Sequence, residues 1–211
     1  MGIREERRRE RRSAVLDAAM SIIETDGASA VTIAAVAQRI GASVGGMYRY
    51  FPTKHAIFAA LQLRAIDAFE EHLLTHLEAA SQGTALERVA LAFSTWMTFR
   101  DVAPTHYRLL DESLSSMERT LDDEQASAVN ERLHTILTHL ADTIETAVAV
   151  EELRPGDAMI RTHLLWSALH GLGHFEKRDH LQPERLRVAA LETTLYETFF
   201  SSWGASAATP S

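Results

Sequence analysis

The sequence predicts an all-α protein built from two helical domains of unequal size. Apolar residues recur at helical spacing through most of the 211 residues. No segment shows the sustained alternation of apolar and polar residues that is typical of a half-buried strand. We expect a small three-helix domain over residues 1–53 and a larger helical bundle over 54–203. Residues 204–211 are small and polar, which predicts a disordered tail.

Charge is distributed unevenly along the chain. The formal net charge is −8, which by itself argues against a nucleic-acid binder. Residues 1–60, however, hold nine Lys and Arg against six Asp and Glu, a net +3, which leaves twelve against twenty-three, a net −11, for the remainder. We therefore expect a basic N-terminal domain that approaches phosphate and an acidic remainder that favours solubility.

The sequence contains no sign of a targeting segment or of thiol chemistry. No run of 18 apolar residues and no signal-peptide pattern is present, so we expect no membrane association. The chain has no cysteine, which removes disulfide and thiol chemistry and suits the cytoplasm.

The first predicted helix begins in the charged run at 4–12 and continues to about Asp26, where Gly27 supplies its end. The interleaved glutamates favour local ion pairs along this helix. Two interpretations of the run remain open. It is a solvated helix start, or it is an arm whose Arg4, Arg7 and Arg8 follow DNA phosphates.

A helix-turn-helix is predicted over residues 32–51. Thr32 is a candidate N-cap for a helix whose apolar stripe ends at Ile40, and Gly41 supplies the permissive backbone of a sharp turn. Ser43 then caps a second helix, expected over 44–51.

The second helix has two unlike sides. Val44, Met47 and Phe51 cluster on one side at about 100° per residue, and Gly45 and Arg49 point roughly opposite. Two glycines cost a helix roughly 1 kcal/mol each relative to alanine, so packing alone does not explain them. The side with Gly45 and Arg49 is narrow and carries a cation, which suits insertion into the DNA major groove. A generic corner of an all-α protein is the alternative.

This segment resembles the DNA-binding signature of the TetR family of bacterial transcriptional regulators. The resemblance rests on a run of residues with fixed spacing: Thr32, Ile33, Val36, Ala37, Gly41, Ser43, Gly45, Tyr48, Tyr50, Phe51 and Lys54. It implies a DNA-binding domain of three helices and a divergent helical domain that dimerises and binds an inducer.

The resemblance also implies which residues contact operator DNA. They are Thr32, Ser43, Val44, Gly45, Gly46, Tyr48, Arg49, Tyr50 and Lys54. Tyr50 and Lys54 would lie on phosphate, and Val44, Gly45 and Arg49 nearest the bases. Gly46 departs from the family, in which a small hydroxyl residue is common at this position.

The rest of the chain predicts further helices at about 54–80, 84–101, 104–116, 122–151, 157–178 and from about 184 to Trp203. The helix at 157–178 is apolar nearly all round, so we expect it to be buried. Its Trp166, His170 and Gly171 resemble a motif found in a subset of TetR C-terminal domains.

That helix and the last one are predicted to pair across a two-fold axis, as a palindromic operator requires. The expected interface residues are Leu169, Gly171, Leu172, Leu191, Leu195 and Phe199. The alternative is that both helices only close the core of one chain.

A small amphipathic inducer is expected to bind among bulky apolar residues and a few polar groups of the larger domain. The candidates are Phe93, Trp96, Arg100, Tyr107, Leu110, Met117, Leu137, Met159, His163 and Trp166. His163, His170 and His174 share a helix face, and His72 and His76 are four residues apart. We expect no metal there, because a site needs three or four convergent ligands. No catalytic dyad and no cofactor motif is evident.

The expected function is that of a homodimeric repressor, bound to a palindromic operator and released by a small organic ligand. It would act at the nucleoid of a bacterial cytoplasm. Two other classes remain open: an all-α enzyme or metal protein built on the histidine face, and an adaptor that has lost DNA binding.

Overall fold

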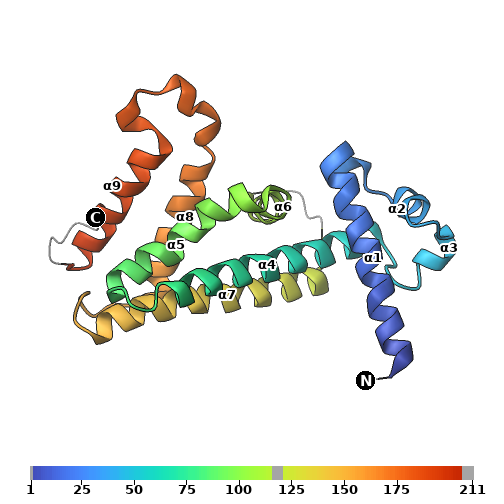
Figure 1. The fold of residues 1–211 in the computed structure, drawn as a ribbon, viewed down its shortest axis with the longest axis horizontal. Helices are drawn as coiled ribbons and strands as arrows, with labels where there is room; N and C mark the ends of the chain where they lie inside the picture. The colour runs from blue at the N-terminus through green and yellow to red at the C-terminus, as the bar shows by residue number, and fades with distance from the viewer. Residues whose placement is uncertain (1, 116–120, 206–211) are drawn as a thin grey trace. The chain divides into compact units, whose positions relative to one another are not determined.

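The computed structural model describes residues 2–115 and 121–205, except for the side chains of 112–115. Within these residues the secondary structure is helical and contains no strand, which confirms the all-α class (Figure 1). The predicted inducer contact Met117 and residues 206–211 of the predicted tail lie outside the described residues. No helix of the described part has both the length and the apolar character needed to cross a membrane.

The α-helices follow the predicted order closely. They are α1 (Ile3–Asp26), α2 (Ile33–Arg39), α3 (Val44–Met47), α4 (Lys54–Ala79), α5 (Ala85–Val102), α6 (Pro104–Ser115), α7 (Asp123–Ala149), α8 (Ala158–Gly173) and α9 (Val188–Ser202). Short 3₁₀ segments lie at Ala28–Ala30, Glu176–Leu181 and Glu184–Leu186.

The described chain divides into two compact units, and the division differs from the predicted boundary after residue 53. Met1–Asp67 and Ala103–Arg132 form the first unit, and Ala68–Val102 and Leu133–Ser211 form the second. Two features account for the difference. The helix α4 continues without a break through residue 67, and α6 contacts α1.

The first unit is organised around α1, whose Val15, Ala19 and Ile22 are buried. The helix extends through the whole charged run at its start, which selects the helical interpretation of residues 4–12. Gly27 ends it at φ 85°, and its N–H bonds to the carbonyl of Ile23. This backbone conformation is one that glycine adopts without the steric cost of a Cβ.

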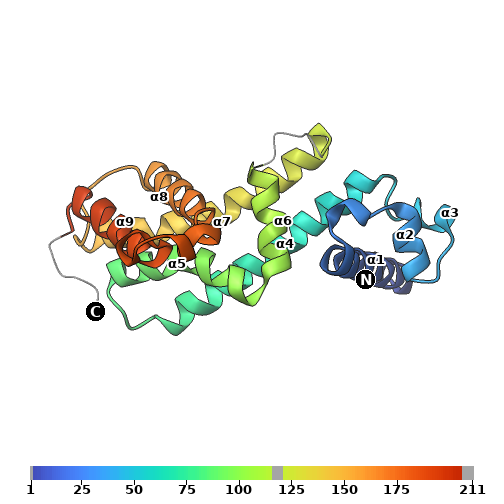
Figure 2. The same cartoon turned by 90° about the horizontal axis from the view of Figure 1, so that it is seen from above.

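The second unit has an aromatic core. The ring of Phe69 lies edge-on to Trp96, with centroids 5.4 Å apart, and 5.2 Å from Phe99. Trp96 in turn meets the edge of Trp166 at 6.2 Å. These contacts join α4, α5 and α8, and α8 also contacts α9 (Figure 2).

The helix α8 differs from its prediction in extent and in burial. It ends at Gly173 rather than near residue 178, and 3₁₀ geometry follows from Glu176. Thr162, Leu165 and Leu169 are buried, but Ile160 is 59% exposed and Leu164 53% exposed. One face contacts α5 and α9, whereas these two residues have no cover within the described chain.

A histidine of the first unit makes the stability of the protein depend on pH. Burial of the ring lowers the pKa of His106, and Arg64 lowers it further, while Glu24 acts in the opposite direction. The unfolded chain therefore binds more protons than the native protein below the ordinary histidine pKa of about 6.5. Stability present at pH 7.5 is lost as the pH falls through this value.

We expect His106→Gln to reduce this loss, because glutamine does not titrate. The measurement is urea unfolding of both proteins at pH 7.5 and 5.5. The exposed His55 provides the matched control in His55→Gln. An equal drop in the free energy of unfolding for His106→Gln and for the unsubstituted protein would contradict the assignment.

Candidate nucleic-acid interface

Two side chains cap the helices of the predicted helix-turn-helix as the sequence indicates. The hydroxyl of Thr32 accepts from the N–H of Ala35 at 3.0 Å, and that of Ser43 accepts from the N–H of Gly46 at 3.1 Å. Gly41 lies between them at φ 65°, in the left-handed region. Each cap satisfies a backbone N–H that the first helical turn leaves without a partner.

The second helix is shorter than predicted. The helix α3 ends at Met47, and residues 48–50 form a turn. The N–H groups of Tyr50 and Phe51 both bond to the carbonyl of Met47, at 2.9 and 3.0 Å, and so close this turn. Consecutive glycines weaken the helix, and Pro52 disfavours helical geometry at the residue before it.

The segment 43–50 presents one side outward and anchors the other. Met47 and Phe51 are each only 1% exposed, whereas Tyr48 is 54% and Val44 42% exposed. Gly45 and Arg49 are also exposed. The predicted arrangement of a buried back and a Gly/Arg front is thus present, except that Val44 lies on the outward side.

The two glycines of α3 occupy different surroundings. A Cβ added to Gly45 would meet nothing within 4 Å, whereas one added to Gly46 would lie 3.1 Å from the capping oxygen of Ser43. Gly46 therefore leaves room for the cap. A side chain at position 46 would require the Ser43 hydroxyl to shift by a few tenths of an ångström.

The remaining predicted DNA contacts lie at helix starts and in the turn. Thr32 precedes α2 and is exposed, and Lys54 is the half-buried first residue of α4. The ammonium of Lys54 lies 5.3 Å from the centre of the Phe58 ring. Tyr50 is half-buried in the turn, and its carbonyl is occupied by a contact from α1.

That contact comes from Arg12, which sequence reasoning missed as a functional residue. Its guanidinium donates to the carbonyl oxygen of Tyr50 at 2.7 Å and lies 4.3 Å from the centre of the Phe51 ring. Burial and the neighbouring Arg8 lower the pKa of Arg12, which nonetheless remains charged at neutral pH. Arg12 thereby ties the end of the exposed segment to α1.

The candidate inducer residues fall in both units of the described chain. Tyr107 and Leu110 belong to the first unit and the other described candidates to the second, which the sequence order did not reveal. Phe93, Trp96 and Leu137 are buried.

Two of the inducer candidates make polar contacts within the chain. Arg100 pairs with Glu176 and, at 3.3 Å, with Asp101. His163 is exposed, and its Nδ1 lies 2.8 Å from the carbonyl of Met159.

Unpaired buried polar atoms mark another part of the second unit. The hydroxyl oxygen of Thr162, a residue with no exposed surface, has no hydrogen-bond partner, and neither does the buried indole nitrogen of Trp166. They are four residues apart on α8, so they share one face. Met159 is half-buried one turn earlier. Buried polar atoms normally have hydrogen-bond partners, so these two atoms are exceptions within the described chain.

Most of the predicted interface residues line one open groove between α8 and α9. The groove measures about 510 Å³, and Gly171, Leu172, Leu191, Leu195 and Phe199 line it. Leu169 is wrong as an interface residue, since it is fully buried in the core of its own chain. A Cβ at Gly171 would meet nothing within 4 Å, so this glycine is not required by packing within the chain.

Arg12→Leu should lower the free energy of unfolding by about 2 kcal/mol. A hydrogen bond from a charged donor contributes about 1.5–3 kcal/mol, and the cation–π contact adds to it. The measurement is urea unfolding followed by circular dichroism. Arg11→Leu changes an exposed neighbour on the same helix, and we expect a change within about 0.5 kcal/mol. Equal effects of the two substitutions would show that the Arg12 contact contributes nothing.

Comparison with known proteins agrees with this geometry. Residues 15–61 match the family described as bacterial regulatory proteins, tetR family. The nucleoid occlusion factor SlmA of Vibrio campbellii is 30% identical over 139 residues, which cover 64% of this chain and 63% of that protein. The transcriptional repressor KstR of Mycobacterium tuberculosis is 47% identical over 66 residues, 30% of each chain. The chain thus spans less than two thirds of the length of these relatives.

Solved structures share the fold across nearly the whole chain. AibR, in complex with isovaleryl coenzyme A and operator DNA, has a TM-score of 0.61 at 16% identity, over 90% of this chain and 98% of that one. The family match falls on the capped helices and the exposed segment 43–50. Residues 15–61 therefore form a domain of the tetR family of bacterial regulatory proteins.

Proposed function

We propose that this protein is a homodimeric transcriptional repressor, which binds a palindromic DNA operator and is released when a small organic ligand binds its second unit. The proposal places it at the nucleoid in the bacterial cytoplasm. The observation that carries it is the outward presentation of Val44, Gly45, Tyr48 and Arg49 by a segment whose back is buried.

Major-groove recognition accounts for this composition. The backbone of Gly45 approaches DNA without a side chain in the way, and Arg49 donates to a guanine edge or a phosphate. Thr32, Ser43, Gly46, Tyr50 and Lys54 flank this front, with Tyr50 and Lys54 on phosphate. The caps and the Arg12 contact hold the front in place before DNA arrives, which reduces the ordering cost of binding.

The groove between α8 and α9 supports dimerisation. Its apolar lining of Gly171, Leu172, Leu191, Leu195 and Phe199 is only half-buried within the chain. An isologous pair of these helices covers the same patch on both chains. It also supplies the two-fold symmetry that presents two copies of α3 to successive turns of DNA, about 34–36 Å apart.

Ligand response is supported by the unpaired polar atoms of Thr162 and Trp166. We place one polar atom of the effector against this pair and its apolar part against the neighbouring ring of Trp96. The solved complex of AibR holds both isovaleryl coenzyme A and operator DNA. In this chain the ligand shifts the DNA-binding equilibrium only by its differential affinity for the two conformations.

Arg49→Ala and Lys54→Ala test the DNA contacts. Arg49→Ala should weaken specific binding by about 1–3 kcal/mol if Arg49 pairs with a guanine edge.

Lys54→Ala should weaken all DNA binding and make the slope of log K against log salt shallower by about one unit. Fluorescence anisotropy with DNA flanking the protein's own gene gives both quantities. Arg187→Ala, exposed at the start of α9, serves as the control. Unchanged affinity and slope for both variants would refute the assignment.

Leu195→Glu tests the interface. A carboxylate in the apolar groove opposes its own copy across the two-fold axis, so we expect a monomer in analytical ultracentrifugation and loss of palindrome binding. Leu186→Glu places the same charge on an exposed leucine outside the groove and should leave the dimer intact. A dimeric Leu195→Glu protein would place the interface elsewhere.

A further inference from the structure

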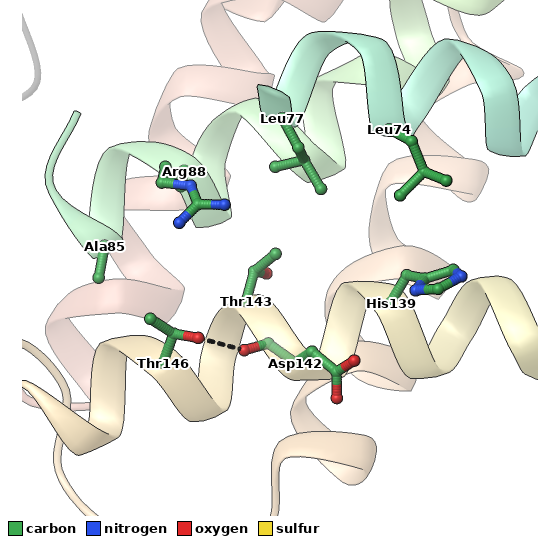
Figure 3. Close-up of a pocket in the computed structure, with 8 residues that line it drawn as sticks. All are labelled: Leu74, Leu77, Ala85, Arg88, His139, Asp142, Thr143 and Thr146. Carbon is green, nitrogen blue, oxygen red and sulfur yellow. Dashed lines mark hydrogen bonds between the residues drawn. The ribbon is translucent and has the colours of Figure 1, made fainter. Parts of the chain in front are cut away.

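The second unit has a small pocket that lacks the predicted inducer and interface residues. It measures about 180 Å³ and lies between the end of α4, the start of α5 and α7 (Figure 3). Its lining is mixed, with Leu74, Leu77 and Ala85 as apolar walls and Arg88, His139, Asp142, Thr143 and Thr146 as polar ones. None of these belongs to the predicted inducer or interface sets.

Arg88 is the unusual member of the lining. Its side chain is half-buried, and its Nε is sealed from solvent without a hydrogen-bond partner. No carboxylate of the described residues pairs with it. Figure 3 shows its guanidinium at the pocket, while the carboxylate of Asp142 points away from it. A buried N–H of a charged group costs free energy unless a hydrogen-bond acceptor pairs with it.

Nearby acids are occupied elsewhere. Glu152 accepts from the N–H of Leu86 at 2.6 Å, and Glu87 accepts from the N–H of Thr84 at 2.8 Å. Both carboxylates therefore cap the first turn of α5. Neither carboxylate pairs with Arg88, whose Nε has no acceptor among the described residues.

The other polar groups of the pocket are already engaged. The hydroxyl of Thr143 donates to the carbonyl of Leu140, and that of Thr146 donates to the carbonyl of Asp142. His139 Nε2 lies 3.2 Å from a carboxylate oxygen of Glu70. Arg88 is therefore the main donor that the pocket offers to a ligand.

From this arrangement we infer that the pocket binds a small amphipathic monocarboxylate. The planar guanidinium fork matches a carboxylate, with which it forms charge-assisted hydrogen bonds. Leu74, Leu77 and Ala85 take the apolar part. A cavity of about 150 Å³ holds benzene, so this pocket has room for an acid of about the size of benzoate or hexanoate.

Other ligand classes fit less well. A phosphate dianion needs more donors than one guanidinium, and three of the eight lining residues are apolar. A cation is repelled by Arg88. The inference concerns binding alone, so it stands whether or not the protein binds DNA.

The test is calorimetric titration of the full chain with sodium benzoate and sodium hexanoate to about 10 mM, a range that covers weak small-ligand affinities. We expect saturable binding of at least one acid. The uncharged isosteres benzamide and hexanamide should bind about tenfold more weakly or worse, because they lack the charge that strengthens the hydrogen bonds. Arg88→Met should weaken acid binding about tenfold or more.

Two further variants separate the pocket from the fold. Leu74→Trp fills the space from an exposed position and leaves Arg88 in place, and we expect it to abolish binding. Arg185→Met is the matched control on an exposed arginine and should bind like the unsubstituted protein. Circular dichroism establishes that each variant is folded.

Three results would overturn the inference. They are the absence of binding for both acids, equal affinity of Arg88→Met for the acids, and inorganic phosphate displacing benzoate at equal concentration. The last would show that the pocket takes a bare anion.

Discussion

The presentation of residues 43–50 depends on a contact between parts of the chain that are far apart in sequence, the hydrogen bond from Arg12 to the carbonyl of Tyr50. The helix α3 has only four residues, too few to be stable from its own hydrogen bonds. Tertiary contacts must hold it, and burial of Met47 and Phe51 supplies its back. Arg12 fixes the end of the segment, where no helical ladder remains. The exposed side chains therefore share a rigid support that comes from α1.

Local signals predicted most of the fold, because capping and turn chemistry act over three or four residues. Thr32 and Ser43 accept the N–H groups of Ala35 and Gly46, and Gly27 and Gly41 adopt the backbone conformations expected of them. The same signals located the exposed segment. They did not show where α3 ends, since a pair of glycines and a following proline weaken a helix without marking one last residue.

Long-range contacts account for what the sequence did not predict. Arg12 and Tyr50 are 38 residues apart, so no periodicity links them. Helical spacing likewise cannot tell an apolar face that packs within the chain from one that awaits a partner, which is why Leu169 and Leu172 were grouped together although only Leu169 is buried. The inducer candidates stay a prediction for a related reason. Their burial was predictable, but which of them converge depends on how separate helices pack.

The open space around Gly45 means that packing within the chain does not restrict the residue at this position. A methyl group there would touch nothing in the chain, and alanine is favoured over glycine in a helix by about 1 kcal/mol. The protein thus forgoes stability at a site where its own architecture imposes no restriction. Packing within the chain therefore leaves residue 45 free to vary, and its tolerance to substitution would report the shape of any surface that meets it.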